Sequence, residues 1–210
     1  MIFSIFPLLF LQLRFMKTED IIAKQLRSLI PLDNNELKTF FSMASKKSIK
    51  KHDFFCKPGQ RISHFYFLET GIARHYYQDK NDKEHTKHFI FGKRFFVASL
   101  SDYIEHTPSK LYCQALEDAT VYYWNLNKIL TIAESNHKWY KLFYVLAGRA
   151  FVGKEQKELE YYTLDATQRY INFSKKHKDI LNRIPNTQIA SYLNISPETL
   201  SRLKKKILFE

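Results

Sequence analysis

The chain has 210 residues, of which 45% are hydrophobic and 26% are charged, as is ordinary for a soluble globular protein. Its 5 glycines exclude collagen-like and flexible low-complexity chains. The chain has 33 lysines and arginines against 21 aspartates and glutamates, which gives a net charge of +12. Such an excess favours a polyanionic partner, either nucleic acid or an anionic membrane surface. A soluble protein that is merely basic is the alternative.

The chain has two cysteines, Cys56 and Cys113. They are too few for the four-cysteine sets of structural zinc sites and iron–sulfur clusters. This low number fits a reducing compartment, and we expect both thiols in the core.

The first fifteen residues, MIFSIFPLLFLQLRF, are almost all apolar. They are fewer than the about 20 residues that a membrane-spanning helix needs, and they lack the basic start and cleavage site of a secretory signal. Because Met16 begins an ordinary N-terminus, we expect translation to start there and residues 1–15 to be a misassigned extension. A weak membrane anchor is the alternative. We therefore expect a cytoplasmic protein without a membrane partner.

Residues 16–136 change from helical to strand periodicity. Apolar residues at helical spacing over residues 20–45, interrupted at Pro31, predict two short helices. From Asp53 onward, short aromatic and β-branched runs alternate with turn signals, which predicts six or seven antiparallel strands in a barrel or sandwich. The basic run over residues 46–51 is predicted to be solvated surface.

Residues 137–162 form a long helical pattern that no proline interrupts. Its small residues Ala147, Ala150 and Gly153 would let a second helix approach closely. We expect a dimerisation helix in a homodimer. A core helix packed on the barrel is the alternative.

Basic residues are concentrated near the C-terminus. Residues 166–210 hold nine lysines and arginines against three aspartates and glutamates, which is half of the net charge. Such asymmetry marks this region as the expected contact with a polyanion.

Residues 187–207 predict two short helices joined by a tight turn. The first covers residues 187–193, and Asn194 after it tolerates the left-handed conformation that a turn requires. Ser196 is a good N-cap for the second helix, and Pro197 suits its first position.

The second helix has two different faces. Its apolar face carries Leu200, Leu203 and Ile207, and its polar face carries Glu198, Ser201, Arg202 and Lys205. This arrangement is typical of a helix-turn-helix unit whose second helix enters the major groove of DNA. There a glutamate can accept from cytosine and an arginine can donate to guanine. Lys204, Lys205 and Lys206 would contact phosphates. A helical hairpin in the core is the alternative.

The segment IASYLNISPETLSRLKK resembles the helix-turn-helix of the Crp/Fnr superfamily of bacterial transcription regulators. The residues that match the Glu-Thr-x-Ser-Arg recognition helix of its fumarate–nitrate regulator branch are Glu198, Thr199, Ser201 and Arg202. The resemblance covers nearly everything after Met16 and looks closest to the short members common in Bacteroidetes.

This resemblance implies an α+β fold. N-terminal helices and an antiparallel β-roll, a double-stranded β-helix like a cyclic nucleotide-binding domain, would occupy residues 16–136. The dimerisation helix would follow over residues 137–162. A helix-turn-helix domain with a truncated wing would occupy residues 163–210. The implied function is sequence-specific regulation of transcription by a homodimer on double-stranded DNA, with RNA polymerase as a further partner.

The sequence departs from the cyclic-AMP-binding members of this superfamily. Their Gly-Glu pair and Arg-Ser/Thr pair would fall in residues 95–100 and 108–111, which lack both the carboxylate and the arginine fork. We therefore expect no response to cyclic AMP. A small anion at Ser99, Ser109 and Lys110 is the remaining candidate, a solvated Lys110 without a ligand is the alternative, and the effector is otherwise left open. The cluster cysteines of the oxygen-sensing branch are missing too, so no cofactor is expected.

An enzyme is the rival class. Glu84, His85 and His88 are the candidate metal ligands, but strand residues three apart point to opposite faces, so no metal site is expected. The chain has no nucleophile elbow, phosphate-binding glycine loop or CxxC motif, so no catalytic residues are expected. The alternative function is a non-catalytic β-roll module that acts through a small anionic ligand or protein partners and has no operator of its own.

Overall fold

The computed structural model describes residues 16–208, so the expectations for residues 1–15 and for a wing after residue 208 lie outside the described residues. The helices are α2 (Thr18–Arg27), α3 (Asn34–Ser42), α4 (Leu100–Ile104), α5 (Leu126–Ser135), α6 (His137–Thr163), α7 (Ala166–Lys176), α8 (Asn186–Leu193) and α9 (Pro197–Leu208). The strands are β1 (Ser45–Ile49), β2 (Phe54–Cys56), β3 (His64–Thr70), β4 (Ile72–Gln78), β5 (Glu84–Phe91), β6 (Arg94–Val97), β7 (Tyr112–Ala115) and β8 (Ala119–Asn125).

The strands form two four-stranded antiparallel sheets, ordered β1–β8–β3–β6 and β2–β7–β4–β5. Gly71 makes the tight turn from β3 to β4 with φ +98°, and a Cβ there would lie 2.6 Å from Cβ of Ala119. Only glycine satisfies both requirements at this position. The antiparallel β-roll expected from the sequence is confirmed, as is the long helix after it.

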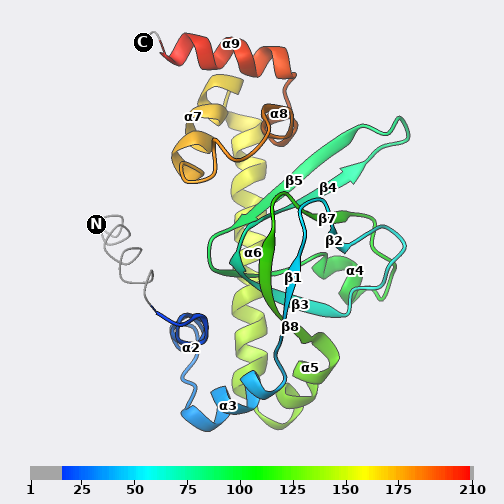
Figure 1. Ribbon diagram of the computed structural model, residues 1–210, viewed down its shortest axis with the longest axis vertical. Coiled ribbons are helices and arrows are strands. Elements are labelled where there is room, and N and C mark those ends of the chain that lie inside the picture. The colour runs from blue at the N-terminus through cyan, green and yellow to red at the C-terminus, as the bar shows by residue number, and fades with distance from the viewer. Residues whose placement is uncertain (1–15, 209–210) are drawn as a thin grey trace.

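Helix α6 runs along the molecule and connects its two ends (Figure 1). Helices α3 and α5 lie at one end, and α7, α8 and α9 lie at the other. With 27 residues, α6 is about 40 Å long at 1.5 Å per residue. None of the helices in residues 16–208 has the length and apolarity that a membrane span requires.

Aromatic stacking fixes the first turns of α6 against the roll. Phe40 of α3 stacks on Trp124 at 4.6 Å and on Trp139 at 5.3 Å between ring centroids. The indole nitrogen of Trp124 also donates to the Phe40 carbonyl at 2.9 Å. Both tryptophans are almost completely buried, so their stacking and apolar burial join α3, β8 and α6 into one core.

Two details of the strand region differ from the expectation. The basic run at residues 46–51 belongs in part to β1, which pairs with β8 at the edge of its sheet. Lys46, Lys50 and Lys51 are nevertheless exposed, in line with the expected surface position, and lysines on an edge strand discourage pairing with another chain. With β1 the strands number eight in the described residues, one more than the upper estimate, and the short helix α4 was not expected.

The two cysteines lie opposite each other on β2 and β7, with Cys56 paired to Cys113 in the ladder. Both are buried and neither forms a disulfide bond, and their burial confirms the expected core positions. Burial raises the pKa of both thiols, so neither is activated as a nucleophile.

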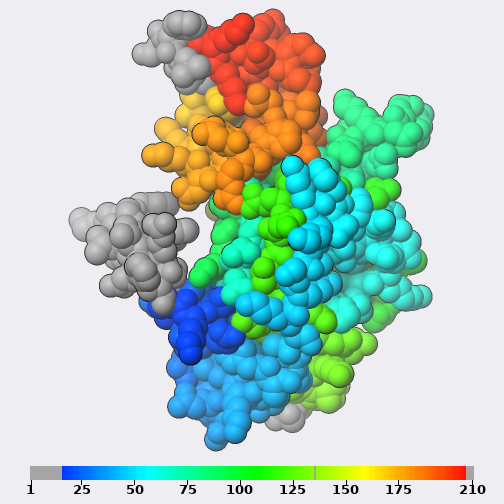
Figure 2. Space-filling model, viewed as in Figure 1, coloured from blue at the N-terminus to red at the C-terminus, as the bar shows by residue number. Residues whose placement is uncertain are grey.

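A second core joins the C-terminal helices to the roll. The roll contributes Ile72, Phe89 and Leu116, all buried. The helices contribute Tyr170, Phe173, Ile180, Ile184, Ile189, Ala190, Leu193 and Leu200. In the space-filling view the orange helices sit on the β-roll, beside the projecting β4–β5 hairpin, and the red helix α9 lies on the orange helices (Figure 2). The C-terminal helices therefore share a packed interior with the roll.

Candidate nucleic-acid interface

Helices α8 and α9 are joined by a tight turn at Asn194. This residue has φ 55° and ψ 48°, the left-handed conformation, and the N–H of Ile195 donates to the carbonyl of Ala190 at 3.0 Å. Helix α9 begins at Pro197, and the hydroxyl of Ser196 accepts from the N–H of Thr199 at 3.1 Å. The two helices, the left-handed turn and the N-cap all agree with the expectation from the sequence.

Helix α9 buries one face and exposes the other. Leu200 is completely buried and Leu203 is half-buried in the second core. The polar face lies at the end of the molecule, where α9 is the outermost element (Figure 1). Its exposed residues are Glu198, Ser201, Arg202, Lys205 and Lys206, while Thr199 and Lys204 are half-buried. The side chain of Ile207 lies outside the described residues.

The first turn of α9 carries a small polar network. The hydroxyl of Ser196 donates to Oγ1 of Thr199 at 3.1 Å, and Nη2 of Arg202 donates to the same atom at 3.4 Å. The pKa of Glu198 is lowered, first by its interaction with the Ser196 side chain, and the charge of Arg202 contributes. Glu198 is therefore ionised at neutral pH, and its carboxylate and the Arg202 guanidinium are both presented to solvent.

The three lysines expected at phosphates differ in their surroundings. Lys204 Nζ donates to Asn186 Oδ1 at 2.5 Å, which ties α9 to the start of α8. Lys205 is exposed, and Lys206 is exposed as well, although it has an interaction within the protein. The roles of all seven α9 residues in DNA binding stay predictions.

A single serine holds α8 on the edge of the roll. Ser191 Oγ accepts from the N–H of Thr86 at 2.9 Å and donates to the carbonyl of Glu84 at 2.9 Å. Strand β5 is the outer strand of its sheet, so this hydroxyl satisfies backbone groups that an edge strand otherwise leaves unpaired. Sequence reasoning missed Ser191, because a serine inside a helix carries no signal of its tertiary partner.

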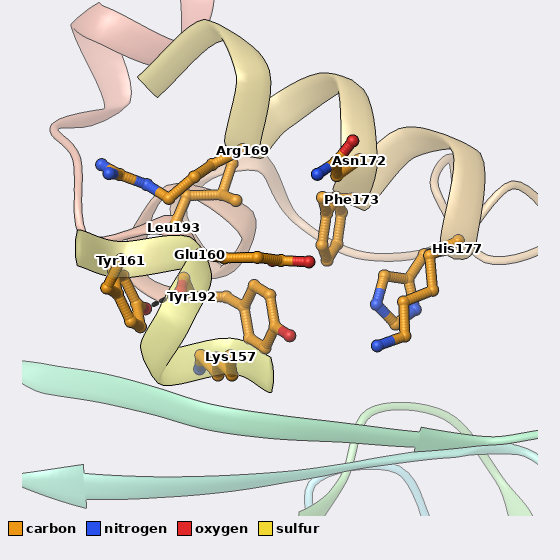
Figure 3. Close-up of a pocket in the computed structure, with 10 residues that line it drawn as sticks. Lys157, Glu160, Tyr161, Arg169, Asn172, Phe173, His177, Tyr192 and Leu193 are labelled. Atoms are coloured by element: carbon orange, nitrogen blue, oxygen red, sulfur yellow. Dashed lines mark hydrogen bonds between the residues drawn. The ribbon is translucent and has the colours of Figure 1, made fainter. Parts of the chain in front are cut away.

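Three further contacts support this position of α8. Lys157 Nζ donates to the carbonyl of Lys87 at 2.8 Å, and the hydroxyl of Tyr161 donates to the carbonyl of Tyr192 at 2.6 Å. Arg183 forms an ion pair with Glu117 of the roll. The first contact joins α6 to β5, the second joins α6 to α8 (Figure 3), and the third joins the segment before α8 to the roll.

The roll itself has a crevice of about 350 Å³. Its lining residues are Phe55, Cys56, Gln60, Arg61, Ile62, Ser63, His64, Tyr66 and Ala98. Arg61 Nη1 donates to the carbonyl of His106 at 2.9 Å, and Nδ1 of His64 shares a hydrogen bond with the Ser63 hydroxyl at 2.8 Å. The crevice thus combines aromatic walls with one guanidinium and one imidazole.

The candidate effector residues lie outside this lining. Ser99 is buried and caps α4, its hydroxyl accepting from the N–H of Asp102 at 3.3 Å. Ser109 is buried, and its hydroxyl accepts from the N–H of Leu111 at 3.2 Å. Lys110 is exposed. Because both hydroxyls already serve local structure, an effector role for these residues stays a prediction.

The two histidines considered as metal ligands, His85 and His88, have different neighbours. His85 Nε2 lies 2.9 Å from Asp79 Oδ2 at the hairpin tip, whereas the ring of His88 lies 6.4 Å from that of His75 on the neighbouring strand. Within residues 16–208 no group of three histidine, cysteine, aspartate or glutamate side chains is arranged to hold a metal ion.

Comparison with known proteins identifies the fold. Residues 46–136 match the cyclic nucleotide-binding domain. No curated protein matches the sequence. Among solved structures, FixK2 from Bradyrhizobium japonicum is 19% identical with a TM-score of 0.69, over 79% of this chain and 85% of its own. A putative transcriptional regulator of the Crp/Fnr family from Eubacterium rectale is 14% identical with a TM-score of 0.69, over 85% and 84%.

The regulator CLP from Xanthomonas campestris, described as responsive to c-di-GMP, is 14% identical with a TM-score of 0.62, over 84% of this chain and 92% of its own. These matches extend beyond the roll through the long helix and the C-terminal helices. The chain therefore has the fold of a cyclic nucleotide-binding domain joined by a long helix to a C-terminal helical unit, as in solved regulators of the Crp/Fnr type.

Proposed function

We propose that the protein is a homodimeric, sequence-specific DNA-binding transcription regulator of the Crp/Fnr type. The observation that carries this proposal is the exposed pair of Glu198 and Arg202 on α9, at one end of the molecule and directly after a capped N-terminus. A helix presented in this way can enter a major groove with its first residues at the base edges. We assign no catalytic activity to the chain.

The roles on α9 follow from side-chain chemistry. Glu198 accepts from a cytosine amino group, and Arg202 donates two hydrogen bonds to a guanine. Thr199 orients Arg202 through their hydrogen bond, and Ser201 is a further base contact. Lys204, Lys205 and Lys206 bind phosphates and set the position on the duplex without reading its sequence.

Dimerisation is assigned to the exposed apolar side of α6. Tyr144 is 78% exposed, Phe151 is 60% exposed and Tyr162 is 82% exposed. Tyr140, Val152 and Leu159 extend the same side and are also exposed. An apolar stripe of this length on a helix is typical of an interface with a second helix. Of the small residues, Ala147 lies at the edge of this stripe, between Tyr144 and Phe151 along the helix, whereas Ala150 and Gly153 lie about 120° and about 180° around the helix from Tyr144 and point away from the stripe.

In such a dimer two α9 helices would reach successive major grooves, about 34 Å apart, on a roughly palindromic site. The protein would act in the cytoplasm, where RNA polymerase is its further partner. We propose that it does not respond to cyclic AMP, because residues 95–100 and 108–111 lack the carboxylate and arginine that hold that ligand in similar proteins. A different small anion, bound by Ser99, Ser109 and Lys110, would be the effector.

Selection of bound duplexes from a random pool, followed by fluorescence anisotropy, tests this function. Arg202→Ala is expected to lose about 1–3 kcal/mol on the selected site and to relax its specificity, whereas Lys205→Ala weakens all sequences alike. Affinity should fall steeply with salt, because several phosphates release counterions. A purified protein that enriches no sequence would refute the proposal and favour the alternative, a non-catalytic module that acts through a ligand or protein partners.

A further inference from the structure

Four side chains that could bind a metal stand in one row across the sheet β2–β7–β4–β5. Cys56 is paired with Cys113 in the β2–β7 ladder, Cys113 with His75 in the β7–β4 ladder, and His75 with His88 in the β4–β5 ladder. Side chains directly opposite each other on antiparallel strands share one face of the sheet. Strand pairing therefore collects two thiols and two imidazoles that no sequence motif connects.

The face that carries this row is the interior of the roll. Burial raises the pKa of Tyr66, which lies on β3 of the other sheet, and the nearby thiols of Cys113 and Cys56 contribute. The Tyr66 ring stacks on Phe96 with 5.1 Å between centroids, and the ring of His75 lies 6.3 Å from that of Phe96. Both cysteines and His75 are buried. The two thiols and one imidazole therefore lie together in an interior lined by aromatic rings.

The two thiols face each other across the ladder. Cβ atoms of directly opposite residues are typically about 4.5–5.5 Å apart, whereas a disulfide bond requires about 3.5–4.5 Å. The nearby Cys56 adds to burial in raising the pKa of Cys113, so the two groups interact. The thiol of Cys56 otherwise donates to the Lys57 carbonyl at 3.5 Å, a weak contact. This separation favours an ion between the two sulfurs over a direct bond between them.

A β-bulge turns Cys56 into the interior and leaves it within reach of solvent. The register of β2 shifts between Phe54 and Cys56, and Phe55 also points inward, with its ring 5.4 Å from that of Tyr66. Bulges redirect side chains in this way. Cys56 lines the crevice of about 350 Å³ in the roll. An ion can therefore reach Cys56 from the crevice and then meet Cys113, its partner in the ladder.

His75 adds an unpaired nitrogen beside the thiols. Its side chain is 7% exposed, and Nε2 has no hydrogen-bond partner among residues 16–208. It lies opposite Cys113 and one strand further from Cys56. In the described part of the chain no three histidine, cysteine or acidic side chains are arranged around one point, and His88 is exposed. The ligand set that the fold assembles is therefore the pair of thiols.

Two thiolates without further ligands suit a monovalent soft ion. Thiolate sulfur selects soft ions such as Cu(I), whereas zinc in a closed site takes four ligands. Burial keeps both thiols protonated and slow to react with ordinary electrophiles. A coordinating metal nevertheless displaces the proton of a thiol. The number and the type of ligands therefore indicate two-coordinate Cu(I) chemistry.

We propose that Cys56 and Cys113 form a binding site for one Cu(I)-like ion, held between two thiolates inside the roll. Two S–H bonds break, two metal–sulfur bonds form and two protons pass to the solvent. The ion enters and stays as Cu(I), so no electron is transferred. Binding itself is independent of the proposed function. Its consequence rests on that function: the same sheet holds Ser191 of α8 at its outer strand β5, so an ion that joins β2 to β7 would alter how α9 meets DNA.

Anaerobic titration of the full-length protein with Cu(I), buffered by a chromogenic chelator, tests the site. One ion per protomer is expected. Cys56→Ala and Cys113→Ala should each weaken binding by more than about 100-fold, because the loss of an outer-shell partner alone costs about 10–100-fold. Met43→Leu is the matched control: it removes a half-buried sulfur elsewhere in the chain, nearly conserves side-chain volume, and should leave the affinity unchanged.

Two further measurements use the unmodified protein and do not depend on whether a variant folds. In weakly buffered solution each bound Cu(I) should release two protons, one from each thiol. An excess of Zn²⁺ should not displace the ion, since zinc requires ligands that the pair does not supply. No uptake of Cu(I), release of fewer than two protons, displacement by Zn²⁺, or equal affinities for the parent and both alanine variants overturns the site.

Duplex binding is measured separately. If the protein takes up Cu(I) but binds no duplex, the proposed function fails and the site stands. If it binds a duplex but takes up no Cu(I), the site fails and the function stands. Where both bind, Cu(I) should change the duplex affinity of the parent protein and leave that of Cys56→Ala unchanged. Equal responses in the two proteins would overturn the coupling.

Discussion

Replacing Ser191 by alanine is expected to destabilise the whole protein by about 1–2 kcal/mol. The substitution removes two hydrogen bonds of 2.9 Å, one from the N–H of Thr86 and one to the carbonyl of Glu84. A protein hydrogen bond contributes about 0.5–1.5 kcal/mol net, so two amount to about 1–3 kcal/mol. Because Ser191 is only half-buried, water can replace part of the loss, which places the value in the lower half of that range.

The assay is equilibrium unfolding in urea at a fixed protomer concentration, since dimerisation makes stability concentration-dependent. Ser201→Ala is the matched control. It is the same substitution inside a helix and therefore brings the same change in helix propensity, but Ser201 is exposed and does not contact β5. The difference between the two variants isolates the contact with β5. A loss of this size lowers the urea midpoint by about 0.5 M. Equal midpoints for the two variants would show that α8 does not depend on the β5 edge in solution.

Three other predictions test the second core, the buried histidine and the long helix. Leu200→Ala should cost about 2–5 kcal/mol in urea unfolding, because this completely buried side chain anchors α9; a cost below that of Ser201→Ala would contradict the packing. His177 has its pKa lowered to about 4, so the unfolded chain takes up its proton first. Its contribution to stability is fully present above about pH 6.5 and is lost as the pH falls towards 4. His177→Phe should therefore retain stability at pH 7 and flatten the loss between pH 6.5 and 4, and an unchanged pH profile would exclude this role. Phe151→Glu should shift the protein to monomer in analytical ultracentrifugation, whereas Arg149→Glu, an exposed residue on the opposite face of the same helix, should not, and an unchanged mass for Phe151→Glu would remove Phe151 from the interface.

Local signals in the sequence were sufficient for most elements of the fold. The turn at Asn194, the cap at Ser196 and the start of α9 at Pro197 depend on backbone preferences within a few residues. The aromatic strands were also recognisable, because their side chains are both β-formers and core residues. Strand β1 was missed since four of its five residues are polar. Its position is fixed by pairing with β8, a contact distant in sequence.

The position of the C-terminal helices on the roll could not be predicted from the sequence. It depends on Ser191 meeting backbone atoms of β5, and on Phe89 and Ile72 facing the helices instead of the interior of the roll. Each is an ordinary residue whose partner lies more than 100 positions away or in another layer. The same limit applies to the buried ring of His177, because its neighbours Phe91 and Tyr192 lie on β5 and α8 and share no motif with it.

The contact between α8 and the exposed side of β5 has a consequence for attempts to study the two halves separately. A fragment that stops after the long helix would leave one strand of the barrel with bare amide and carbonyl groups, and it would uncover Ile72, Phe89 and Leu116. An unpaired strand edge beside newly exposed apolar surface pairs with other chains. Truncated versions of this protein should therefore aggregate. Effector binding measured on the isolated barrel would not represent binding to the intact protein.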